Sequence, residues 1–113
     1  MSAEHPAKVY VAYCTCPDAA TAESLAGELV EAGLAACVNI LPSVRSVYRW
    51  QGAIERDEEL LMLIKTSAAR VDALIAHIRE RHPYDVPEVI CHPISAGNDD
   101  YLDWVRQCTK TQA

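Results

Sequence analysis

The stretch from Leu34 to Thr66 constrains the fold more than any other part of the sequence, because its pattern is that of one long β-hairpin. Between Ala36 and Trp50 apolar residues occupy mostly even-numbered positions, which is the period of a strand. The other half ends in the run Leu60–Ile64, whose apolar residues are typical of a strand covered on both faces. We expect the turn at Gln51 and Gly52, because glycine readily adopts the positive φ of tight hairpin turns.

The length of this hairpin predicts that the chain assembles with copies of itself. If residues 36–49 are extended at about 3.3 Å per residue, the arm is about 46 Å long. A compact chain of this size has a radius of gyration of only about 13 Å, so the arm extends beyond its own core. Its far end would need apolar cover from another chain. We therefore predict an oligomer interface that includes Tyr48, Trp50 and Met62.

The elements outside the hairpin predict an α+β fold. Patterning indicates a strand at 8–15, a helix between Asp18 and Gly33, a helix after Ser67 that ends at His82, a strand at 88–94 and a last helix capped by Asn98. The buried stripe of the last helix would consist of Tyr101, Trp104, Val105 and Cys108. The resulting order, βαββαβ plus a C-terminal helix, is that of ferredoxin-like folds, in which two helices cover one face of a four-stranded antiparallel sheet. The other face is then apolar and bare, which again favours oligomerisation.

The composition of the 113-residue chain describes one globular domain and excludes several classes of partner. Half of the residues are hydrophobic and 23% are charged, which is too apolar for a disordered chain. The net charge of −6 and the lack of a Lys/Arg cluster argue against a nucleic-acid partner. No apolar run is long enough to span a membrane, and no signal-peptide pattern is visible. Five cysteines without a Cys-x-x-Cys pair indicate reduced thiols, so we expect a cytoplasmic protein.

Two cysteines and one histidine are candidate metal ligands. Cys14 and Cys16 lie two residues apart at the end of the first strand, so their side chains point to the same face. They could bind a soft metal, although cysteines of this kind are more often buried structural residues. His82 ends the second helix, where it could be a metal ligand or a positive charge that complements the helix C-terminus.

The sequence gives no positive sign of catalysis, so we do not predict an enzyme. Glu55, Asp57 and Glu59 share one face of a strand and could form a general acid–base pair, but a solvated edge is the more common arrangement. Lys65 follows a buried run, where a charge is unfavourable unless it is paired, so it could bind an anion or pair with a glutamate. No phosphate-binding glycine loop, hydrolase motif or zinc-protease motif occurs.

A family resemblance extends in order over nearly the whole chain. Its blocks are Gly33–Ile40, Tyr48–Glu55, Ile64–Thr66, His82–Glu88 and Tyr101–Trp104. Together they resemble CutA, the divalent-cation tolerance family. The resemblance implies a single domain over residues 1–113, with a core at about 8–107, and a ferredoxin-like protomer similar to the PII signal-transduction proteins. It also implies a compact homotrimer in which the long hairpins join the three sheets.

The resemblance further implies a copper site. Its family ligands are a cysteine at the end of the first strand and two adjacent histidines before Pro-Tyr; Cys14 and His82 match two of these positions, and Arg81 occupies the third. A guanidinium does not bind copper, so we expect weak to moderate binding that Arg81→His would strengthen. Cys16 could add a second thiolate, which would favour Cu(I).

Three interpretations of the function follow from the resemblance. The first is a non-enzymatic cytoplasmic trimer that takes part in tolerance of, and response to, divalent metal ions, copper in particular. The alternative is a PII-like signalling protein that binds a small ligand in clefts between subunits, and we assign Lys65, Tyr84 and Glu88 to that cleft. An enzyme that uses the same cleft is a third reading, without a recognisable base.

Overall fold

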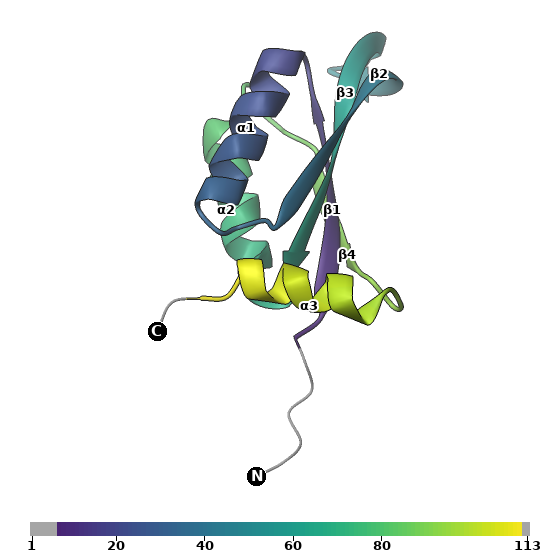
Figure 1. Ribbon diagram of the computed structural model, residues 1–113. Coiled ribbons are helices and arrows are strands. Elements are labelled where there is room, and N and C mark those ends of the chain that lie inside the picture. The colour runs from purple at the N-terminus through teal and green to yellow at the C-terminus, as the bar shows by residue number, and fades with distance from the viewer. Residues whose placement is uncertain (1–6, 112–113) are drawn as a thin grey trace.

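The computed structural model describes residues 7–111 as one antiparallel sheet with helices packed on one face (Figure 1). The elements are β1 (Val9–Cys16), α1 (Ala19–Glu31), β2 (Cys37–Trp50), β3 (Ala53–Ser67), the 3₁₀ turn η1 (Ala68–Arg70), α2 (Val71–Arg81), β4 (Val89–Pro93) and α3 (Asp99–Cys108). The strand order is β2-β3-β1-β4, and every neighbouring pair is antiparallel. The α+β order predicted from the sequence, with its C-terminal helix, is confirmed.

The hairpin of β2 and β3 gives the molecule its elongated shape, with principal extents of 56 × 25 × 23 Å. Gln51 and Gly52 form the predicted turn, and both have positive φ, +51° and +83°. Such a turn matches the right-handed twist of the two strands that it joins. A register shift between Leu41 and Val44 interrupts the pairing, and Ser43 takes a φ of +63° there. In Figure 1 the tip of the hairpin curves away from α1.

One face of the sheet forms the core with α1 and α2. The fully buried strand residues on this face include Ala12, Cys14, Cys16, Met62 and Ile64, and the helix residues that pack against them include Ala22, Leu25, Leu29, Leu74 and Ile78. In β3 the inward side chains are the even-numbered ones, because strand side chains alternate between faces.

Met62 belongs to this core, which corrects its predicted place at an oligomer interface. The side chain has no exposed surface in the single chain, so no partner could bury it further. Its neighbours Leu61 and Leu63 point the opposite way and are half-buried. The other two residues expected at an interface, Tyr48 and Trp50, lie near the hairpin end and are each 40% exposed, so a partner could still bury them.

The opposite face of the sheet is mostly apolar, with Asn39, Lys65 and His92 among its residues, and we call it the open face. Pairing places Val11, Tyr13, Leu41, Leu61, Leu63 and Ile90 on it. All six are half-buried or exposed, and Ile90 keeps 59% of its surface accessible. In Figure 1 the helices α1 and α2 lie together on the other side of the sheet.

The helix caps predicted at Asp18 and Asn98 are present, but α3 packs less deeply than expected. Asp18 accepts a hydrogen bond from the Thr21 N–H (2.8 Å), and Asn98 accepts one from the Asp100 N–H (2.9 Å). In the expected stripe of α3 only Val105 is buried, whereas Trp104 is 46% exposed. The reason is that α3 crosses the end of the sheet away from the hairpin tip (Figure 1) and contacts only a small cluster with Val9 and Ala36.

Candidate metal centre and the neighbouring cavity

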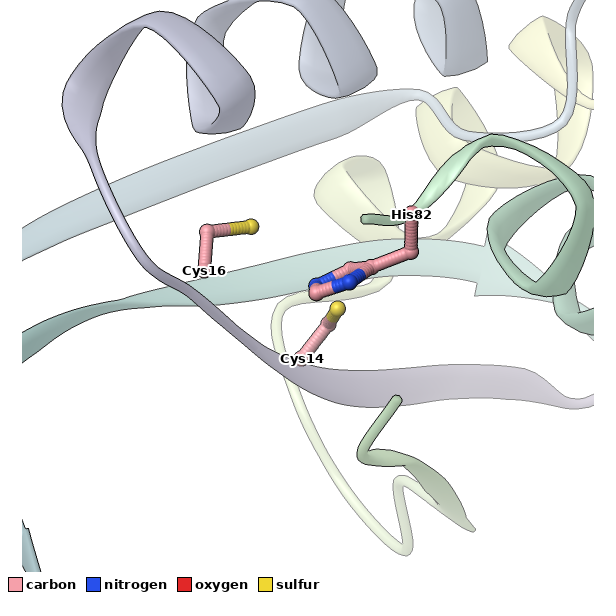
Figure 2. Close-up of side chains that lie close together, drawn as sticks. All are labelled: Cys14, Cys16 and His82. Carbon is pink, nitrogen blue, oxygen red and sulfur yellow. The ribbon is translucent and has the colours of Figure 1, made fainter. Parts of the chain in front are cut away.

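Two thiols and one imidazole converge at the end of β1. Sulfur or nitrogen atoms of Cys14, Cys16 and His82 lie within 4.8 Å of one another, and all three side chains are buried (Figure 2). No other group of three or more His, Cys, Asp or Glu side chains comes this close among residues 7–111. Two metal–sulfur bonds of about 2.3 Å span about 4.6 Å. A small movement would therefore let all three side chains bind one metal ion.

Local structure explains why these side chains meet. Cys14 and Cys16 are two residues apart on β1, an inner strand, and both point toward the helices. His82 is the first residue after α2, and its N–H still donates to the Ile78 carbonyl (2.9 Å). Pro83 cannot continue the helix, so the chain turns here and directs the imidazole onto the end of β1.

Both nitrogens of the His82 ring already have partners. The Tyr84 N–H can only donate, and it lies 3.2 Å from Nδ1. The Thr15 carbonyl can only accept, and it lies 2.8 Å from Nε2. These partners assign a neutral imidazole that carries its proton on Nε2. In the described structure His82 therefore fastens the end of α2 to β1.

This hydrogen-bond pattern means that metal binding must release the Tyr84 N–H. If Nδ1 binds the metal, its lone pair is no longer available to that N–H. If Nε2 binds the metal, the neutral ring must carry its proton on Nδ1, which then cannot accept. In both cases the segment after His82 has to move, which reduces the net affinity of the site.

The two thiols influence each other's ionisation. A hydrogen bond between the thiols, together with burial, raises the pKa of Cys14 well above its ordinary value. The same hydrogen bond lowers the pKa of Cys16, so the pair releases its first proton there. A metal that binds both sulfurs must displace both protons, and acid therefore opposes binding.

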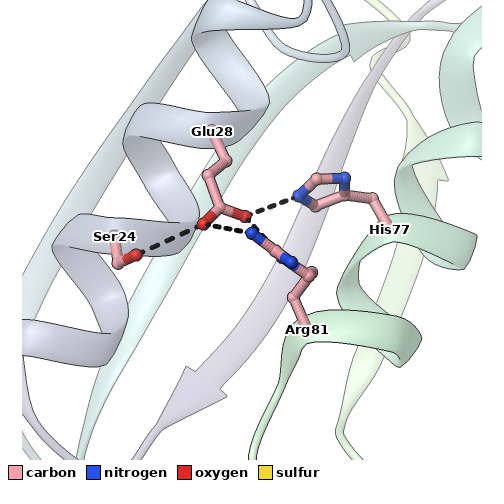
Figure 3. A network of polar contacts seen from close by, with 4 residues as sticks. All are labelled: Ser24, Glu28, His77 and Arg81. Atoms are coloured by element: carbon pink, nitrogen blue, oxygen red, sulfur yellow. Dashed lines mark hydrogen bonds and ion pairs between the residues drawn. The ribbon is translucent and has the colours of Figure 1, made fainter.

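Arg81 does not approach the thiols. Its guanidinium contacts both carboxylate oxygens of Glu28 on α1 at 3.3 Å, and His77 and Ser24 bond to the same carboxylate (Figure 3). The Arg81 side chain is 55% exposed, whereas the thiols are fully buried. A residue at position 81 is therefore directed to the surface between α1 and α2, so the expectation that Arg81→His would strengthen the metal site loses its basis.

The Glu28 network predicts a pH-dependent contribution to stability. Hydrogen bonds from Arg81 and His77 lower the pKa of Glu28 below its ordinary value of 4.5. A lowered carboxyl pKa stabilises the folded state above the ordinary value, and the effect is lost as the pH falls through the lowered pKa. We expect Glu28→Gln to reduce the melting temperature slightly at pH 7, with a gap from the parent that closes as the pH falls through the lowered pKa of Glu28. The exposed Glu31→Gln is the control, and a gap that does not change with pH would contradict the assignment.

A cavity lies beside the thiol–imidazole cluster, between the hairpin and the segment that follows His82. Its volume is about 560 Å³, and its walls are formed by Thr15, Ser46, Val47, Tyr48, Trp50, Glu59, Tyr84, Asp85, Val86 and Glu88. The Tyr84 hydroxyl donates to Glu59 at 2.8 Å. Burial and this hydrogen bond raise the pKa of Tyr84, so the phenol remains a donor at neutral pH.

The structure brings two of the three expected cleft residues together. Tyr84 and Glu88 line the cavity. Lys65 does not line it, because it lies near the C-terminal end of β3, away from the hairpin tip. The Lys65 ammonium donates to the Asn39 side chain and, at 3.5 Å, to the Leu63 carbonyl. Glu59, which sequence reasoning assigned to a solvated edge, is instead only 7% exposed.

Comparison with known proteins assigns the chain to a family. A family model described as CutA1 divalent ion tolerance protein matches residues 10–108. The chain belongs to this family. It is 48% identical over 106 residues to human Protein CutA, covering 94% of this chain and 59% of the human protein. It therefore spans about three fifths of that relative.

A bacterial relative and a solved structure match over most of their lengths. The divalent-cation tolerance protein CutA of Pectobacterium atrosepticum is 47% identical over 95 residues, which is 84% of this chain and 86% of that protein. The crystal structure of CutA1 from Oryza sativa superposes with a TM-score of 0.90 at 43% identity, covering 95% of this chain and 98% of the other. In residues 7–111, no helix combines the length and apolar character needed to cross a membrane.

Two features of the site could not be read from the sequence. Thr15 holds His82 through its carbonyl, and a backbone contact 67 residues apart in sequence has no signature. Glu59 gave a weak signal, because it stands where the acidic run of β3 meets the apolar run. A carboxylate at such a boundary can lie under a neighbouring loop, as Glu59 does under Tyr84.

Proposed function

We propose that this chain takes part in divalent metal tolerance as a copper-binding protein, with Cys14, Cys16 and His82 as the ligands. The convergence of these three buried donors is the observation that supports the proposal. Thiolate and imidazole are soft to borderline donors, which favour copper over magnesium or calcium. Two thiolates in a buried site favour Cu(I) over Cu(II).

Weak to moderate affinity is part of the proposal. Binding must displace the thiol protons, and the hydrogen bond with Cys16, together with burial, raises the pKa of Cys14. It must also free the Tyr84 N–H from the His82 ring. Both steps subtract from the intrinsic strength of the copper–thiolate bonds.

A competition titration tests the ligand set. Cu(I) is titrated under anaerobic, reducing conditions against a coloured Cu(I) chelator. We expect Cys14→Ser, Cys16→Ser and His82→Ala each to reduce the affinity at least about tenfold, because each removes one donor. Arg81→His should leave the affinity unchanged, since position 81 is directed away from the thiols.

The matched control is Cys108→Ser, which removes an exposed thiol outside the cluster. Its affinity should equal that of the parent. If Cys108→Ser lost as much affinity as the cluster variants, or if the cluster variants lost none, copper would be bound elsewhere and the proposal would fail.

The Tyr84 amide provides a second readout of the same site. Copper at either nitrogen of His82 deprives this N–H of its acceptor, so its hydrogen exchange should accelerate when one equivalent of Cu(I) is added. The Ile94 N–H, bonded to the Val9 carbonyl at 2.8 Å at the other end of the sheet, is the control. Unchanged exchange at Tyr84 in copper-loaded protein would show that His82 is not a ligand.

We further propose a cytoplasmic, non-enzymatic homotrimer built from one domain with its core at about residues 8–107. The open face and the exposed Tyr48 and Trp50 support assembly, because an apolar surface of this extent is unfavourable in water. Free cysteines at all five positions fit a reducing compartment. Relatives from rice and Archaeoglobus fulgidus carry names that place them in the chloroplast and the periplasm, so fractionation of cells is the test of location.

A second candidate function is PII-like binding of a small ligand. The cavity of about 560 Å³ favours it, because its volume is in the range of sites for small molecules. Tyr84 and Glu88 line that cavity, and Tyr84 also bonds to the proposed copper ligand His82. A thermal-shift screen with nucleotides and metals would distinguish the two functions by which class raises the melting temperature.

A further inference from the structure

The cavity contains a buried carboxylate without a cationic partner in its own chain. Glu59 is only 7% exposed, and the Tyr84 hydroxyl donates to its Oε2. None of the ion pairs within residues 7–111 includes Glu59. A buried negative charge is unfavourable unless a positive group is close, and one neutral hydrogen bond compensates it only in part.

The other walls of the cavity match a cation as well. Asp85 and Glu88 add two further carboxylates, and the lining residues include no lysine, arginine or histidine. Tyr48, Trp50 and Tyr84 supply aromatic rings. Aromatic faces attract ammonium groups and also pack against hydrocarbon, so this combination suits an organic cation.

An inorganic ion fits the cavity less well. Its volume of about 560 Å³ is far larger than an ion requires. Its carboxylates also do not converge, because the only close group of three or more potential ligands in the described chain is the thiol–imidazole cluster. Calcium and magnesium need several oxygen ligands at one point.

We propose that this cavity binds a small organic cation with a primary ammonium group. The ammonium pairs with Glu59, and the hydrocarbon part lies against Trp50 and Tyr48, so in the proposed trimer the site is a cleft at the subunit interface. The inference rests on the second candidate function and gives it a ligand class.

The probe is 1,5-diaminopentane, and its neutral counterpart is 1,5-pentanediol. Tryptophan fluorescence is followed in a Trp104→Phe background, where Trp50 is the only indole. The full chain is used without copper. We expect saturable binding of the diamine, no binding of the diol, and a dissociation constant about ten- to a hundredfold higher in Glu59→Gln, since a charge-assisted bond is lost.

Glu59→Gln keeps an acceptor for the Tyr84 hydroxyl, so the fold should persist. Glu58→Gln is the matched control, because Glu58 is exposed and only loosely paired with Arg45 at 3.9 Å. Trp50→Leu, read by calorimetry, gives an independent variant and should also weaken binding.

Each outcome of this experiment decides a separate point. Equal binding of diol and diamine, or of Glu59→Gln and Glu58→Gln, would overturn the cation class. Binding of ATP but not of the diamine would overturn the class and leave the small-ligand function standing. Absence of binding for diamine, diol and ATP alike would overturn both, without affecting the copper site.

Discussion

Met62→Lys should strongly destabilise the folded chain. Met62 has no exposed surface and packs beside Ile64 under α1 and α2. A lysine at this point buries a charge without a partner, which costs about 3–5 kcal/mol. A domain of this size is stable by about 5–15 kcal/mol, so the substitution would remove between about a fifth and all of its stability. Circular dichroism and thermal melting of the expressed protein measure the result.

Met62→Leu is the control, because it preserves volume and apolar character and should cost less than about 1.5 kcal/mol. A Met62→Lys protein that melts at the parent's temperature would place Met62 on the surface. The assignment of the faces of β3 would then be wrong.

Leu63→Lys should give a folded chain that no longer assembles. Leu63 follows Met62 but lies on the open face, opposite Tyr13 on β1. A lysine there can reach water in the single chain, whereas in an assembled interface it would be buried without a partner. Light scattering should report the mass of three chains for the parent and of one chain for the variant.

The control for this experiment is the exposed Glu31→Lys on the helical side of the molecule. If Leu63→Lys retained the parent's assembled mass, the open face would not be the interface. If the parent itself were a monomer at micromolar concentration, the proposed trimer would be wrong.

The order of elements could be predicted because each has a local signal. The hairpin turn needs residues that tolerate positive φ, and Gln51 and Gly52 supply it. Asp18 and Asn98 cap helices through bonds that span only two or three residues. Such signals depend on neighbours in the sequence, so they can be read without the fold.

The direction of the side chains in β3 could not be predicted. Residues 60–64 are all apolar, so the alternation that distinguishes the two faces of a strand is absent. Only pairing with β1 shows that Met62 is opposite Cys14 on the helical face. The depth of α3 was missed for a related reason, since a helical stripe predicts a face but not how much of it is covered.

The candidate site was predicted in its residues but not in its bonds. Cys14, Cys16 and His82 were candidate ligands from their positions in the sequence, and the family resemblance supported Cys14 and His82. The partners of His82 and Arg81 lie far away in sequence, at Thr15 and Glu28. These contacts exist only because α2 returns to the end of β1 and packs beside α1.

X-ray absorption at the copper edge tests the central claim most directly. The full chain is loaded with one equivalent of Cu(I) under reducing conditions, and the scatterers around the metal are identified. The proposed site predicts two sulfur atoms and one nitrogen atom in the parent, and loss of the sulfur signal when Cys14 and Cys16 are both changed to serine. A copper environment of nitrogen and oxygen alone, or a sulfur signal that survives the double substitution, would contradict it.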